Sequence, residues 1–159
     1  MLFRAELEES LLTLGDPEPD AARQWTVAVY LGGDNNLENG ALLDLLEMQK
    51  GMPAKGCEVV ALIDRHRDSD DNSEDWTDTR VLRIRAGGDG TFDTFGKPVE
   101  RDTGDPRTLA SFVGGVFRKF PAKRHAVVLW NHGGGWTGMV NDDDAPGRRG
   151  TSQIGRAHG

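Results

Sequence analysis

The sequence predicts an α/β protein with an open, mostly parallel sheet and flanking helices. Three apolar runs, at residues 25–31, 58–63 and 126–130, have the length and composition of buried strands. Two stretches with helical periodicity, at 37–48 and 105–120, alternate with them. Strands and helices that alternate through short loops form right-handed βαβ units. If the first strand lies between the other two, the carboxyl ends of the first and third strands meet where ligands bind in such sheets.

Length and composition indicate one domain without a nucleic-acid or membrane partner. The chain has 159 residues, and 36% hydrophobic residues with 21 glycines are an ordinary globular composition. A net charge of −7 argues against nucleic acid or an anionic membrane as partner, and no segment is apolar enough to span a bilayer. The N-terminus lacks the regions of a secretory signal, so the location stays open, with the cytoplasm as the default. The single cysteine, Cys57, excludes an internal disulfide framework.

The first 24 residues are expected to lie outside the main domain. Apolar residues recur with helical spacing among acidic ones, which predicts an amphipathic helix over residues 1–15. Two prolines interrupt the next stretch, so residues 16–24 are predicted to be a linker. The sequence does not decide whether the helix packs on the domain or holds a partner.

The first strand, at 25–31, ends in the polar stretch Gly-Gly-Asp-Asn-Asn. Its last three residues, Asp34, Asn35 and Asn36, can cap a helix or contact a ligand. Asn35 followed by Glu38 resembles a capping box, which predicts the start of a helix that closes at Gly51. The second strand, at 58–63, completes the βαβ unit.

Residues 67–78 form a polar, acidic stretch that is predicted to be a solvated loop. The opening of a calcium-binding loop is matched by Asp68, Asp70 and Asn72. However, Ser73 and Thr79 stand where that motif requires a glycine and a bidentate glutamate. We therefore expect no specific metal there.

The remaining elements complete the order of strands and helices. Residues 79–85 alternate imperfectly and suit an exposed strand, and 91–103 are expected to return as its hairpin partner. Asp105 followed by Pro106 is a favourable start for the second helix. The apolar run at 126–130 then predicts a strand that is buried on both faces.

His132 follows this last strand and precedes three glycines. A strand that ends here projects a titratable imidazole from its tip, and glycine lets the backbone approach a ligand closely. Consecutive N–H groups at such a turn can also stabilise a developing oxyanion. The alternative is that His132 only caps the strand and that the glycines form a tight turn. The glycines and the sheet context favour a functional histidine.

Four motifs resemble the clostripain family of cysteine peptidases, in the family's order and at its spacing. They are residues 25–31 with 34–38, 104–109, 121–123 and 129–136. The resemblance implies a caspase-like α/β fold for residues 25–145, incomplete at its C-terminus, and cleavage of peptides or proteins after arginine or lysine.

The resemblance also assigns roles to individual residues. It places the catalytic histidine at His132 and an oxyanion-hole N–H at Gly133. In the neighbouring loop, Asp34, Asn35 and Asn36 are expected to bind substrate. The resemblance makes calcium a candidate cofactor, and the sequence does not decide whether this chain uses it.

The family's nucleophile has no counterpart at the expected place. It is expected on a further strand, in an Asp-Ala-Cys context, together with the aspartate that receives a basic side chain. Cys57 opens the second strand, at the end opposite His132, and is interpreted as a small core residue. The chain is therefore expected to be the N-terminal, inactive part of a peptidase whose C-terminal part is its partner.

The end of the sequence allows two explanations of this gap. Residues 146–159 are predicted to be a disordered tail, and their last six or so resemble the translation of a sequencing adapter. Alternatively, the chain is a natural fragment, cleaved after Arg148 or Arg149, since family members are often nicked between histidine and cysteine.

Two other functions stay open from the sequence. His-Gly-Gly-Gly is also the oxyanion loop of esterases with the α/β-hydrolase fold, whose serine would lie downstream. That scheme gives no role to the asparagine-rich loop after the first strand, so it ranks second. The third hypothesis is a non-catalytic module that binds peptides.

Overall fold

A computed structural model describes residues 20–66, 76–133, 138–143 and 152–154. Within these residues, five strands form one sheet in the order β4-β3-β2-β1-β5. The predicted amphipathic helix at the N-terminus, most of the acidic loop and the two arginines of the proposed cleavage site lie outside the described residues. No helix in the described part of the chain could cross a membrane.

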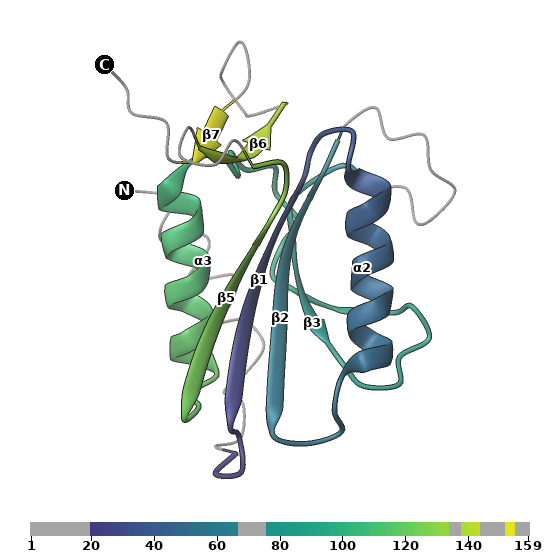
Figure 1. Cartoon of the computed structure of the whole chain (residues 1–159), viewed down its shortest axis with the longest axis vertical. Coiled ribbons are helices and arrows are strands. Elements are labelled where there is room, and N and C mark those ends of the chain that lie inside the picture. Colours follow the sequence, from purple (N-terminus) through teal and green to yellow (C-terminus); the bar gives the residue numbers. More distant parts are fainter. Residues whose placement is uncertain (1–19, 67–75, 134–137, 144–151, 155–159) are drawn as a thin grey trace.

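The strands and helices follow the predicted order (Figure 1). Their bounds are β1 Trp25–Gly33, α2 Glu38–Gly51, β2 Cys57–Arg65, β3 Arg80–Ile84, β4 Asp93–Phe95, α3 Pro106–Lys119, β5 Arg124–Trp130, β6 Met139–Asp142 and β7 Ser152–Ile154. β1 pairs in parallel with both β2 and β5, whereas β3 and β4 are antiparallel additions on the far side. The predicted order of the three parallel strands, with the first in the middle, is confirmed.

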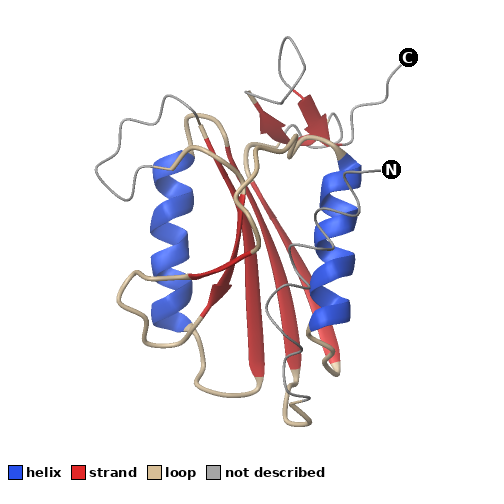
Figure 2. Ribbon diagram, turned by 180° about the vertical axis from the view of Figure 1, so that it is seen from behind, coloured by secondary structure: helices blue, strands red, loops and turns tan. Residues whose placement is uncertain are grey.

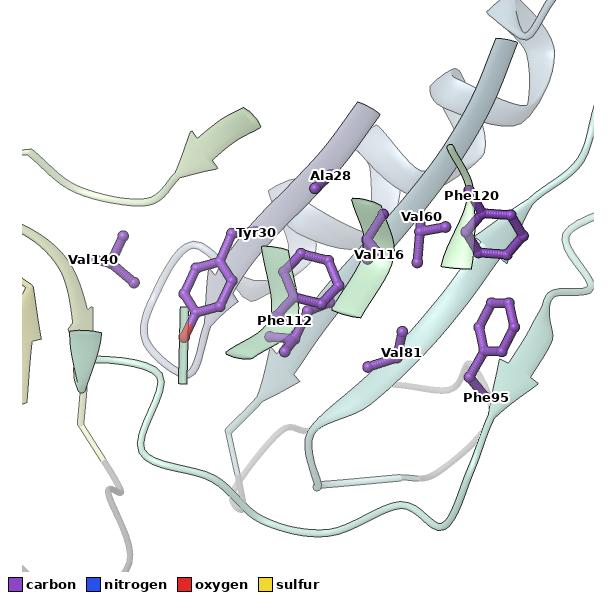
Figure 3. Packing of buried hydrophobic residues seen from close by; sticks show 10 residues of the cluster. Ala28, Tyr30, Val60, Val81, Phe95, Phe112, Val116, Phe120 and Val140 are labelled. Carbon is purple, nitrogen blue, oxygen red and sulfur yellow. The ribbon is translucent and has the colours of Figure 1, made fainter. Parts of the chain in front are cut away.

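The two helices cover opposite faces of the sheet (Figure 2). Successive residues of a strand point to opposite faces, so each buried strand supplies both cores. On the α3 face, Tyr30 packs against Phe112, with ring centroids 5.9 Å apart, inside a cluster that also holds Val140 (Figure 3). On the α2 face, Ala41 and Leu45 pack against the alternate residues of β1 and β2.

The two helices begin differently. At α3, Asp105 Oδ1 accepts a hydrogen bond from the Arg107 N–H at 2.8 Å, and Pro106 occupies the first position, as predicted. The capping box predicted for α2 is wrong, because the helix starts after Leu37 without a side-chain cap. Glu38 instead pairs with Arg65 at 2.5 Å.

The burial of two strands differs from the prediction. β5 lies at the edge of the described sheet, and Val127 and Val128 are each 43% exposed, so the strand is not buried on both faces. A strand with one neighbour and no helix fully above it cannot be covered on both sides. Conversely, the strand expected to be exposed at 79–85 is mostly buried, because β3 lies between β2 and β4.

A small second sheet stands beside the carboxyl end of the large one. β6 and β7 pair antiparallel there (Figure 1). The prediction of a disordered tail over residues 146–159 therefore fails for Ser152–Ile154. The sequence of β7 is short and polar, and only its pairing with β6 makes it a strand.

Candidate active site

His132 lies just beyond β5, at the carboxyl end of the sheet, where β1 also ends. Its side chain is exposed, and Nε2 lies 2.7 Å from Asn36 Oδ1 in the loop between β1 and α2. An amide oxygen only accepts hydrogen bonds, so Nε2 donates in this arrangement and Nδ1 is the nitrogen with a lone pair. The expected meeting of the two loops at one edge is confirmed.

The neighbour of His132 fixes this loop to β1. Asn131 Nδ2 donates to the Gly32 carbonyl oxygen at 2.7 Å, and Asn131 Oδ1 accepts from the His132 N–H. A Cβ on Gly32 would lie 2.6 Å from Asn131 Nδ2 and 2.7 Å from Val140 Cγ1. Glycine at this position therefore allows β1, the histidine loop and β6 to approach one another.

The chain returns along the histidine loop in β6. The Val140 N–H donates to the His132 carbonyl oxygen at 3.2 Å, and Gly133 forms an isolated antiparallel bridge with Met139. Val140 has a φ of 59°, which is strained for a β-branched residue, and its side chain is fully buried beside Tyr30 (Figure 3). Burial in the core holds this strained backbone in place.

Gly133 is exposed, and a Cβ built on it would meet no atom within 4 Å. The space beside this backbone is open to a ligand. Its role in an oxyanion hole stays a prediction, and the next two glycines lie outside the described residues.

The three polar residues after β1 occupy different environments. Asn36 is the one that contacts the imidazole. Asn35 is 7% exposed and holds the turn, since Oδ1 accepts from the Leu37 N–H and Nδ2 donates to the Gly32 carbonyl oxygen. Asp34 is completely buried. Neither Asp34 nor Asn35 offers its side chain to a substrate in this structure, so the predicted substrate-binding role is kept for Asn36.

Asp34 belongs to a cluster of three buried carboxyl groups that the sequence patterns do not predict. One oxygen from each of Asp34, Asp64 and Asp142 lies within 4.8 Å of the others, and all three side chains are completely buried. They come from the ends of β1 and β2 and from β6. One signal was available, because Asp34 and Asp64 both follow buried runs whose carboxyl ends share an edge.

Threonines bind this carboxyl cluster from the adjoining segments. Asp64 accepts from the Thr79 hydroxyl at 2.6 Å and from the Thr103 hydroxyl at 3.0 Å. Asp142 Oδ2 accepts from the Thr103 N–H at 2.6 Å, and it lies 3.2 Å from the Thr103 hydroxyl, whose single hydrogen is shared with the nearer Asp64 Oδ2. Burial and the charges of neighbouring acids raise the pKa of Asp64 well above its usual range. Burial and a side-chain hydrogen bond with Asp34 raise the pKa of Asp142 to about 7.

The carboxyl cluster is the one group in the described residues whose donor set resembles a metal site. Carboxylate oxygens are ligands that calcium prefers. Here, however, both oxygens of Asp64 and Oδ2 of Asp142 already accept hydrogen bonds from hydroxyl or amide groups, and Asp142 is hydrogen-bonded to Asp34. The arrangement fits shared protons rather than a bound calcium ion.

Cys57 cannot act together with His132. In the sheet register, Trp25 of β1 lies opposite both Cys57 of β2 and Arg124 of β5. Cys57 is therefore level with Arg124, which is eight residues before His132. At about 3.3 Å per residue, this places the two roughly 25 Å apart along the sheet. Burial, then Glu58, raises the pKa of the Cys57 thiol, which disfavours the thiolate. Cys57 is half-buried and packs at the margin of the α2-side core, rather than inside it as predicted.

An apolar groove lies on the α2 face, away from His132. Its volume is about 530 Å³, and Val27, Val128 and Trp130 line it beside Met48 and Met52. It adjoins the exposed edge of β5, and none of its lining residues takes part in the hydrogen bonds of the histidine loop.

Comparison with known proteins gives one consistent relationship. The model of the clostripain family matches residues 29–151. Clostripain from Hathewaya histolytica is 32% identical over 123 residues, an alignment that covers 69% of this chain and 23% of that protein. The chain thus spans about a quarter of the length of this relative.

Solved structures show the same fold. A secreted C11 cysteine protease from Bacteroides thetaiotaomicron, in complex with an irreversible peptide inhibitor, matches with a TM-score of 0.63 and 23% identity, over 83% of this chain and 36% of that one. A B. fragilis cysteine protease matches with a TM-score of 0.56 and 24% identity, over 71% of this chain and 92% of that one. The α/β fold with a mostly parallel sheet is therefore confirmed, and the chain belongs to the clostripain family.

Proposed function

We propose that this chain is the histidine-bearing part of a cysteine endopeptidase that cleaves after arginine or lysine. The observation that carries the proposal is the exposed imidazole of His132 at the carboxyl edge of the sheet, held through Nε2 by Asn36. Membership of the clostripain family supports the peptidase class. It also favours this function over the esterase alternative.

His132 would serve as both base and acid, through Nδ1. Nδ1 takes the proton of the attacking thiol, and the thiolate forms a bond to the carbonyl carbon of the substrate. The same nitrogen then returns the proton to the leaving amine as the peptide bond breaks. Asn36 would keep the imidazole in the tautomer that this exchange needs, since its oxygen accepts from Nε2.

Gly133 would stabilise the tetrahedral intermediate. Its backbone follows His132 directly, and the space beside its Cα is open. An N–H aimed at the developing oxyanion there would contribute in the way oxyanion-hole donors do, by about 10²–10³-fold in kcat.

The nucleophile is assigned to polypeptide that does not belong to these 159 residues. Cys57 is the only cysteine in the sequence, and it lies at the wrong end of the sheet. Cleavage after Arg148 or Arg149 would separate the histidine-bearing and cysteine-bearing parts. The net charge of −7 suits the attraction of basic substrates.

The test is hydrolysis of an arginyl amide by a protein that carries both this chain and the proposed cysteine. We expect turnover that a thiol alkylator abolishes, and none from the 159-residue chain alone, because an imidazole without a thiol forms no acyl-enzyme. Inhibition by a serine-directed reagent but not by the alkylator would favour the esterase. Thiol-dependent turnover by the 159 residues alone would disprove the assignment of the nucleophile.

A further inference from the structure

The carboxyl cluster of Asp34, Asp64 and Asp142 joins three segments that are distant in sequence. All three side chains are completely buried, and one oxygen of each lies within 4.8 Å of the others. The proposed peptidase mechanism uses none of them. Their location is nevertheless close to the site, because β6 carries Asp142 and pairs with the loop of His132.

Three ionised carboxylates cannot coexist at this spacing in a buried site. Like charges so close disfavour one another's ionisation, and burial disfavours each charge on its own. A basic group, His66, approaches the cluster, with Nε2 at 3.8 Å from Asp34 Oδ1, and its side chain is partly exposed. The residue before His66 is Arg65, the last residue of β2, and its guanidinium is paired with Glu38. The cluster therefore has to retain protons to remain packed.

We propose that a proton shared by Asp34, Asp64 and Asp142 latches β6, and with it the loop of His132, onto the end of the sheet. The latch goes beyond the proposed peptidase function and does not depend on it. Asp142 is the residue through which β6 enters the cluster.

The hydrogen bonds of β6 show what the latch holds. Asp142 Oδ2 accepts from the Thr103 N–H, which lies before α3. The Asp143 N–H donates to the Asp34 carbonyl oxygen at 3.2 Å. At the other end of β6, the Val140 N–H donates to the His132 carbonyl oxygen. Release of Asp142 would therefore loosen the strand that supports the histidine loop.

Other charged and titratable groups surround the cluster from β1, β2 and the segment before α3. They are Tyr30, His66, Glu100, Asp102 and Asp105. Glu100 raises the pKa of Asp64 and Asp102 raises the pKa of Asp142, so both acids add to the cost of a negative charge on the cluster. Asp102 and Asp105 also raise the pKa of Tyr30. Tyr30 donates its hydroxyl hydrogen to the Thr103 carbonyl oxygen and stays neutral.

The direction of the pH effect follows from the docked and undocked states. Burial, then the bond to Asp34, raises the pKa of docked Asp142 to about 7. In an undocked β6 it would return to the ordinary carboxyl value of about 3.9. The docked state binds the proton more tightly, so docking weakens as the pH rises through this interval and levels off above about pH 7. From about pH 5 to about pH 8, the population of undocked β6 should rise roughly 100-fold.

Amide hydrogen exchange of the 159-residue chain tests the latch without any enzyme assay. After correction for intrinsic exchange, the protection of the Val140 and Thr103 amides should fall roughly 100-fold from about pH 5 to about pH 8. The amide of Val60, at the centre of β2, should not follow them. Protection of Val140 and Thr103 that does not change with pH would overturn the proposal.

The matched variants are Asp142→Asn and Asp143→Asn. Asparagine at 142 keeps an acceptor for Thr103 and a donor for Asp34 but cannot ionise, so most of the pH dependence should disappear. Asp143 is exposed, and its substitution should leave the dependence intact. An unchanged pH slope in Asp142→Asn would also overturn the latch. If Asp142→Asn does not fold, the pH dependence of amide protection in the unsubstituted chain still tests the proposal.

A second series with calcium chloride separates protons from a bound cation. We expect the same pH slope with calcium as with a chelator, because the cluster is held by hydrogen bonds. If calcium abolished the pH dependence of amide protection, a cation would be replacing the proton, and this would contradict the proposal.

Discussion

At the scale of single residues, the position of one proton on His132 determines what the site can do. Asn36 accepts from Nε2, which leaves the lone pair on Nδ1. A base must present a lone pair to the proton it removes, so a thiol would have to approach from the Nδ1 side. Substitutions at two residues, in a protein that carries both this chain and the proposed cysteine, test this geometry.

Replacing His132 by alanine should lower kcat by about 10²–10⁴-fold, because thiol activation and protonation of the leaving amine are lost together. KM for a basic peptide should change little. Cleavage after Arg148 or Arg149 should stop if it is the enzyme's own reaction. The control is His125→Ala, since His125 is an exposed histidine at the other end of β5 that packs on Phe117. Near-normal thiol-dependent kcat in His132→Ala would remove this residue from the mechanism.

Replacing Asn36 by alanine should lower kcat roughly 3–10-fold, which is the effect of losing one orienting hydrogen bond. Replacement by aspartate should shift the acid limb of the pH profile of kcat to higher pH, because a carboxylate stabilises the imidazolium. Gln24→Ala removes a half-buried amide before the start of β1, at the opposite end of the sheet, as a control. If Asn36→Asp leaves the pH profile unchanged, Asn36 does not orient His132.

At the scale of elements, the site depends on the close approach of β1, the histidine loop and β6. Gly32 is the point of contact, and any side chain there would collide with Asn131 and Val140. Val140 can move little, because it is buried in the α3-side core. Asn131 would have to move instead, and it is the residue that fixes the histidine loop.

The variant Gly32→Ala should therefore destabilise the chain by about 1–3 kcal/mol, the usual cost of overpacking. Gly51→Ala is the matched control, because a Cβ there meets nothing within 4 Å and alanine favours the end of α2. Urea unfolding measures both. A Gly32→Ala variant as stable as Gly51→Ala would show that the contacts at Gly32 relax without cost.

Local patterns predicted the elements well but could not predict their partners. The runs of β1 and β2 and the start of α3 are encoded within a few residues, so their types and their order follow from the sequence. The local pattern predicts that Glu38 caps α2, but its carboxylate pairs with Arg65, 27 residues away in the sequence. The cluster of Asp34, Asp64 and Asp142 likewise depends on three segments that only the fold brings together. The neighbour that makes β7 a strand also lies elsewhere in the chain.

At the scale of the whole molecule, the two sides of the described parallel strands are shielded unequally. β4 and β3 shield one side of the parallel strands, whereas β5 forms the other edge. Trp25 is 40% exposed next to this edge, and the apolar groove of about 530 Å³ continues from it beneath α2. An apolar edge with unpaired backbone groups is a template for another chain.

We therefore expect the 159-residue chain to self-associate. Its apparent mass in size-exclusion chromatography should rise with protein concentration, because two copies can cover each other's β5 edge and groove. Val128→Lys should shift the equilibrium toward the monomer, since Val128 is 43% exposed and lines the groove, and a charged residue on an edge strand opposes pairing. Val99→Lys places the same charge at a site that is 39% exposed outside the sheet, so it should not affect association. A chain that elutes as a monomer at every concentration would contradict this expectation, as would equal effects of the two lysines.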